Sequence, residues 1–186
     1  MNTKKLLLVV MVAFSLQSNA QRFFTKGGEI FFNATSPASP EKIEAVNKSV
    51  VCVVDSKTGA IQFSVLMKGF EFHSALMQEH FNENYVESEK FPSAVFKGQI
   101  SNNEIVNYNK DGVYTVNVKG KLTIHGVTKD VESNGKLAVK DGKINASAEF
   151  NIVLKDYSIS IPALVAEQVA KIASIKVACS LELLKN

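Results

Sequence analysis

The stretch YTVNVKGKLTI, residues 114–124, decides the fold class. Apolar residues recur at every second position: Tyr114, Val116, Val118, Leu122 and Ile124 alternate with Thr115, Asn117, Lys119, Lys121 and Thr123. Successive side chains of a β-strand point to opposite faces of the sheet. The stretch therefore predicts an antiparallel strand with one face buried and the other in water.

The same period of two occurs in residues 61–67, 94–100, 144–154 and 175–183. Turn residues separate these stretches, and Asp111-Gly112 and Asp141-Gly142 supply the positive φ that tight hairpins need. Strands joined by hairpins form a meander. A meander long enough to leave no exposed edge closes into a barrel or stacks as a sandwich, and the pattern alone allows both.

Two segments break the alternation and predict short helices. Ser74 suits the N-cap of a helix over residues 75–84, and Pro162 suits the first turn of a second helix over residues 163–172. Each helix has apolar residues three or four positions apart. Either would cover a barrel mouth as a lid or plug an open end of the core.

Length and composition indicate one globular domain. The chain has 186 residues, of which 46% are hydrophobic and 21% charged, and this excludes disordered and collagen-like classes. Without Lys4 and Lys5 the formal net charge falls from +3 to +1. We therefore expect no nucleic-acid partner, because such proteins carry a strong positive patch.

The first twenty residues have the pattern of a secretory signal peptide. Lys4 and Lys5 precede an apolar run at residues 6–16, and Ser18-Asn19-Ala20 places small residues at a cleavage site. The run is too short to cross a bilayer as a helix. We expect residues 1–20 to be removed and residues 21–186 to form a periplasmic or secreted domain.

Cys52 and Cys179 are the only cysteines. They fall near opposite ends of the mature chain, where a closed barrel would bring its first and last strands together. Export permits a disulfide, but two buried thiols are an equally ordinary outcome. Neither cysteine lies in a CxxC motif or beside a histidine, so we expect no metal site.

The stretch GKLTIHGVTK, residues 120–129, resembles the YceI family. FNENYVESEKFPSAVF at residues 81–96 and LKDYSI at residues 154–159 are similar to further family motifs, and the resemblance spans roughly residues 28–184. It implies an exported all-β protein, an antiparallel up-and-down lipocalin-like β-barrel with one or two short helices, that binds polyisoprenoid lipids. The chain departs from the family where Lys155 replaces an arginine, Ser158 replaces a glycine, and Phe72-His73-Ser74 replaces an Arg-Asp pair.

Composition alone does not say whether the barrel is filled or hollow. The resemblance favours a tunnel that accepts an apolar lipid of isoprenoid or quinone type, with no other cofactor. A transient contact with a membrane and a homodimer are further partner options that the sequence leaves open. The cavity candidates are Phe63, Val65, Met67, Phe70, Phe72, Leu76, Met77, Phe81, Phe96, Val116, Val118, Leu122, Ile124, Phe150 and Ile152.

Familiar catalytic motifs are absent from the sequence. His73, His80 and His125 lie in no HExxH motif, and neither a GxSxG elbow nor a phosphate-binding loop is present. We expect His125 to hydrogen-bond turn backbone and the protein not to be an enzyme. Three alternatives stay open: an enzyme using Lys155, Asp156 or His125, a ligand-free stress-related structural barrel, and an outer-membrane barrel. A barrel of the last kind would need more aromatic residues than this chain, which has no Trp and four Tyr. The absence of Trp also argues against a true lipocalin.

Overall fold

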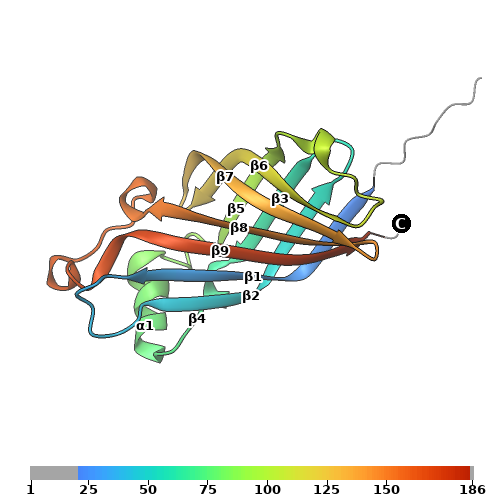
Figure 1. Ribbon diagram of the computed structural model, residues 1–186. Coiled ribbons are helices and arrows are strands. Elements are labelled where there is room, and N and C mark those ends of the chain that lie inside the picture. Colours follow the sequence, from blue (N-terminus) through green and yellow to red (C-terminus); the bar gives the residue numbers. More distant parts are fainter. Residues whose placement is uncertain (1–20, 185–186) are drawn as a thin grey trace, which may run out of the picture.

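Eight long antiparallel strands follow one another around a closed barrel in the computed structural model, which describes residues 21–184 (Figure 1). They are β1 (Arg22–Thr35), β2 (Glu44–Asp55), β3 (Ala60–Leu66), β5 (Ser93–Ile100), β6 (Gly112–Ile124), β7 (Val127–Lys140), β8 (Lys143–Val153) and β9 (Val169–Leu183). Each strand pairs with the next, and β1 pairs with both β2 and β9. The predicted up-and-down barrel is therefore confirmed, and the sandwich alternative is excluded.

The register places the predicted apolar faces inside the barrel. Leu122 on β6 lies opposite Phe96 on β5, and both point inward, whereas Lys121 is exposed beside Lys97. Strand β1 lacks a clear alternation in the sequence because its pairing with β2 shifts register on both sides of Gly28. Such bulges add a residue to one strand and interrupt the period of two.

The connection between β3 and β5 contains the only α-helix of the described residues, α1 (Ala75–His80). Ser74 Oγ accepts a hydrogen bond from the Met77 amide at 3.4 Å, which confirms the predicted N-cap. A π-helical turn, η2 (Phe81–Tyr85), continues α1 close to the predicted end. The connection also contains η1 (Met67–Gly69) and the short strand β4 (Glu71–Phe72), which pairs with β2.

The second predicted helix, over residues 163–172, is wrong. Only a 3-10 turn, η5 (Ala163–Val165), forms there, and β9 begins at Val169. Val169 pairs with Thr35 of β1 and Ile172 pairs with Val153 of β8. Because these residues lie between two strands, ladder hydrogen bonds on both sides outweigh their weak helical pattern.

We call the end of the barrel that holds α1 the α1 end. It also contains the connections at residues 36–43, 125–126 and 154–168, the last with η4 (Leu154–Tyr157), and lies at the left of Figure 1. The opposite end holds the remaining hairpins and η3 (Asn103–Ile105). It is closed by packing: Phe23 stacks on Tyr108 with ring centroids 5.9 Å apart, and the Tyr108 hydroxyl donates to Asn103 Oδ1 at 2.7 Å. Burial, with Asp55 nearby, raises the pKa of Tyr108 to about 12.

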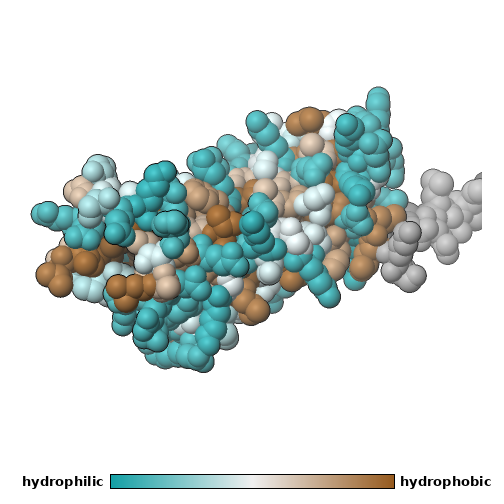
Figure 2. All heavy atoms as spheres, turned by 90° about the horizontal axis from the view of Figure 1, so that it is seen from below, coloured by the Kyte–Doolittle hydropathy of each residue, from teal (hydrophilic) through white to brown (hydrophobic). Residues whose placement is uncertain are grey.

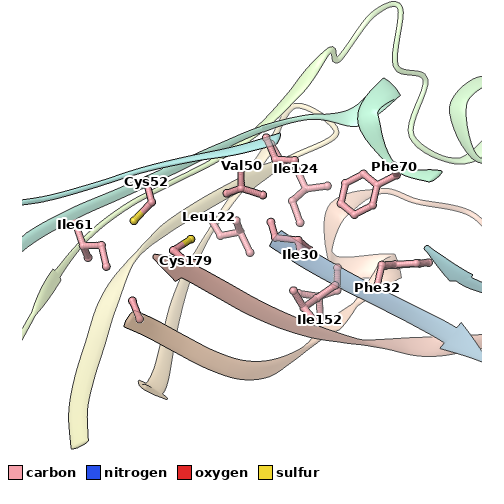
Figure 3. Packing of buried hydrophobic residues seen from close by; sticks show 14 of the residues in the cluster. Ile30, Phe32, Val50, Cys52, Ile61, Phe70, Leu122, Ile124, Ile152 and Cys179 are labelled. Carbon is pink, nitrogen blue, oxygen red and sulfur yellow. The ribbon is translucent and has the colours of Figure 1, made fainter. Parts of the chain in front are cut away.

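Cys52 and Cys179 are free, buried thiols on β2 and β9, the two strands that flank β1 (Figure 3). Gly28 of β1 lies against Cys179, and a Cβ there would be only 2.5 Å from Cys179 Sγ. The Cys52 thiol donates to Cys179, which raises the pKa of Cys52 and lowers that of Cys179. Of the two alternatives expected from the sequence, a disulfide and a pair of buried thiols, the structure has the buried thiols.

The predicted signal peptide, residues 1–20, lies outside the described residues, as do residues 185–186. Across residues 21–184, no helix has the length and apolar character needed to span a bilayer.

Candidate functional site

The half of the barrel next to α1 contains a cavity of about 630 Å³. Its walls come from β1, β3 and β5–β9, and residues 67–86 cover it at the α1 end. Several almost fully buried side chains, among them Val54, Ile144 and Leu181, lie outside the cavity lining. The barrel is therefore packed at one end and hollow at the other. A volume of this size is typical of sites for small organic ligands.

All of the predicted cavity candidates line this space. The strands contribute Phe63, Val65, Phe96, Val116, Val118, Leu122, Ile124, Phe150 and Ile152. The connection between β3 and β5 contributes Met67, Phe70, Phe72, Leu76, Met77 and Phe81. Figure 3 shows several of these side chains, among them Leu122, Ile152 and Phe70, converging from different elements.

Sequence reasoning missed part of the wall. From β1 it missed Ile30, Phe32 and Ala34, whose pattern the bulges obscure, and from β7 it missed Val131 and Leu137. Ile175 and Val177 of β9 also line the cavity. Their alternation was visible in the sequence, so they could have been included.

Four phenylalanine rings form a cluster beneath α1. Phe81 packs against Phe72, Phe70 and Phe32, with ring centroids 4.9, 5.6 and 5.8 Å apart. None of the residues of α1 itself is buried, so Phe81, which follows it directly, is its main anchor. The Phe72 amide also donates to Gln78 Oε1 at 3.2 Å. This cluster covers a large part of the cavity at the α1 end.

His125 joins three connections and does not line the cavity. Its Nδ1 donates to the Tyr157 carbonyl at 3.1 Å, and its Nε2 lies 2.6 Å from Glu87 Oε2. The ring also meets the edge of Phe91 at a centroid distance of 4.6 Å. The predicted hydrogen bond to turn backbone is thus confirmed, and the contacts are those of a structural residue.

Polar residues are a minority of the lining and gather in two places. Ser39, Glu41, Ser74 and His80 lie at the α1 end, and a second group lies between β7 and β8. Lys155 and Asp156 are exposed on η4 and line no part of the cavity. Among residues 21–184 there is no group of three or more His, Cys, Asp or Glu side chains that could hold a metal ion. The arrangement is suited to enclosing an apolar molecule.

A closed antiparallel barrel with an apolar interior cavity defines the class of lipocalin-like barrels. Within that class the chain belongs to the YceI family, because the model of the YceI-like domain matches residues 14–182. The resemblance noted in the sequence is thereby confirmed. No curated protein matches the sequence.

Three solved structures share the fold. A polyisoprenoid-binding domain from Saccharophagus degradans has a TM-score of 0.76 at 11% identity, over 89% of this chain and 99% of that chain. BcnA from Burkholderia cenocepacia has a TM-score of 0.65 at 17% identity, over 83% and 95% of the two chains. A YceI protein from Campylobacter jejuni has a TM-score of 0.51 at 18% identity, over 74% and 81%.

Proposed function

We propose that the protein is an exported carrier that holds one long apolar lipid, of isoprenoid or quinone type, in the barrel. The cavity is the observation that carries this proposal. Protein interiors have few voids larger than a water molecule, yet this cavity has the volume of about twenty water molecules. A void of this volume in an otherwise packed barrel is best explained as a binding site.

The chemistry of the lining favours a flexible hydrocarbon. Phenylalanine and methionine side chains offer large, adaptable apolar surfaces that need no hydrogen-bond partner. Burial of a methylene group contributes about 0.8 kcal/mol, whereas association costs roughly 4–15 kcal/mol. A ligand must therefore bury about ten or more methylene groups to bind well. The solved structure from Saccharophagus degradans is described as a polyisoprenoid-binding domain, and this supports the same ligand class here.

Exposed apolar residues at the α1 end support transient contact with a membrane that supplies or receives the lipid. Leu76, Leu164 and Ile172 are all exposed there, and Leu164 is 93% exposed. Figure 2 shows apolar groups, in brown, at the left end of the molecule among hydrophilic ones. The proposal that the carrier works outside the cytoplasm rests on the sequence of residues 1–20.

The binding test is a titration of delipidated protein with farnesol, geranylgeraniol and a longer polyprenol. We expect affinity to rise with chain length, because each added methylene group buries more apolar surface. Ala148→Phe should abolish binding, since Ala148 faces the cavity. The matched control is Ala178→Phe on the neighbouring strand, which adds the same ring to the outer surface. Equal binding by both variants, or none by the parent protein, would contradict the proposal. The second result would favour a ligand-free structural barrel.

A further inference from the structure

The barrel wall is incomplete between β7 and β8. Their ladder runs only from Lys140 opposite Lys143 to Gly135 opposite Ala148. Beyond this point β7 continues to pair with β6, and β8 continues to pair with β9. Both strands therefore remain extended but separate, as they do towards the left of Figure 1. The part of β8 that does not pair with β7, residues 149–153, is roughly 17 Å long at about 3.3 Å per residue.

The cavity reaches the outer surface through this slit. Glu132 and Asn151 point outward from β7 and β8, yet both line the cavity. Conversely, Ser133 and Phe150 point inward, yet both are partly exposed. Lys136 and Ser147, the outward-facing pair next to the end of the ladder, line the cavity as well, so residues of both faces meet one continuous space along this seam.

The slit has firm ends and a weakly held middle. The ladder closes it at Gly135, and at the α1 end η4 is tied to the β6–β7 turn by the bond from His125 to the Tyr157 carbonyl. Between these ends, the Ser133 hydroxyl lies 3.4 Å from the Glu149 carbonyl across the slit and shares its one proton with the Asn134 carbonyl, 3.1 Å away on its own strand. The adjacent carboxylates are held elsewhere, with Glu132 3.1 Å from Lys119 and Glu149 3.5 Å from Lys176.

We propose that the slit between β7 and β8 is a side portal through which a hydrocarbon chain enters and leaves the cavity. This inference rests on the proposed lipid-binding function and adds a route to it. Entry at the α1 end would have to part the packed rings around Phe81, whereas entry through the slit disrupts no ladder bond. A chain longer than the cavity can also remain partly outside the barrel through the same opening.

The test closes the portal from outside with a short bifunctional thiol cross-linker in the double variant Glu132→Cys/Asn151→Cys. Both positions face outward and would be opposite each other if the register continued, so the apolar lining is unchanged. The control is Asn117→Cys/Asn134→Cys, an exposed pair on the closed wall between β6 and β7 that lines no part of the cavity. The native Cys52 and Cys179 are buried in every variant. Loading of a fluorescent polyprenol is followed by stopped-flow.

Cross-linking across the slit should slow loading at least tenfold without changing the final occupancy, and cross-linking the control should have no effect. Ser133→Ala needs no cross-linker and should load about twice as fast, because it removes the hydrogen bond across the slit. Unchanged rates in both the cross-linked protein and Ser133→Ala would overturn the portal while leaving lipid binding intact. If the unmodified protein takes up no polyprenol, the proposed function fails, and the portal fails with it.

Discussion

Val177→Thr distinguishes a hollow barrel from a filled one. Val177 lies on β9, faces the cavity, and has Ile30 and Ala148 as its neighbours across the two ladders. Valine and threonine have nearly the same shape, and both suit a strand, so the substitution changes polarity alone. Neither cross-strand neighbour carries a side-chain group that could bond the new hydroxyl.

The expected effect is on binding rather than on folding. In the empty cavity the hydroxyl can be hydrated, so the free energy of unfolding should change by less than about 0.5 kcal/mol. An apolar chain would displace that water and leave the hydroxyl unpaired at a cost of about 1–3 kcal/mol. Affinity for the polyprenol should therefore fall roughly 5- to 150-fold.

Val54→Thr is the matched control. Val54 is fully buried on β2 and lies outside the cavity lining. Its hydroxyl would be unpaired in the folded protein itself, so this variant should lose about 1–3 kcal/mol of stability. Its affinity for the ligand should stay unchanged. Urea unfolding and polyprenol titration of the two variants give both quantities. Loss of stability without loss of affinity in Val177→Thr would refute the hollow barrel.

Three further substitutions test the scaffold. Gly28→Ala should lower the free energy of unfolding by about 1–3 kcal/mol in urea melts, because its Cβ would crowd Cys179, whereas Gly27→Ala, with nothing within 4 Å, should not. In His125→Asn, the asparagine tolerates the backbone φ of 51° at this position, but its side chain is too short to make both hydrogen bonds of the histidine. The substitution should lower the free energy of unfolding by about 1–3 kcal/mol. An unchanged Tm would show that the two hydrogen bonds do not stabilise the fold. Hydrogen bonds from the Thr58 amide and its neighbours lower the pKa of Asp55 below its ordinary 3.8, so its stabilising effect is present above about pH 4 and lost as pH falls through the lowered value. The Tm difference between the parent protein and Asp55→Asn should therefore shrink on acidification, and a difference independent of pH would contradict this.

The sequence predicted the barrel because alternation reports directly on a wall with one buried face. In β6, every predicted inward residue from Tyr114 to Ile124 is at least half-buried, and the lysines between them are exposed. The pattern failed where local geometry breaks the period, as at the Gly28 bulges of β1. It also failed at residues 169–172, where ladders on both sides override a weak helical spacing.

Neither the cavity nor the slit could be predicted from the alternation of apolar and polar residues. Alternation marks Val118 and Leu122 as inward-facing whether the interior is filled or hollow, because the volume depends on how all the strands are arranged. The alternation also gives no sign that β7 separates from β8. Residues 149–153 alternate as regularly as residues 144–148, yet only the latter pair with β7.

Native mass spectrometry of the protein purified from its own source, without added lipid, tests the central claim most directly. We expect a population heavier than the chain by the mass of one lipid, which organic solvent releases and fragmentation identifies as an isoprenoid or quinone. A single species at the mass of the bare chain, which stays bare after incubation with polyprenol, would contradict it.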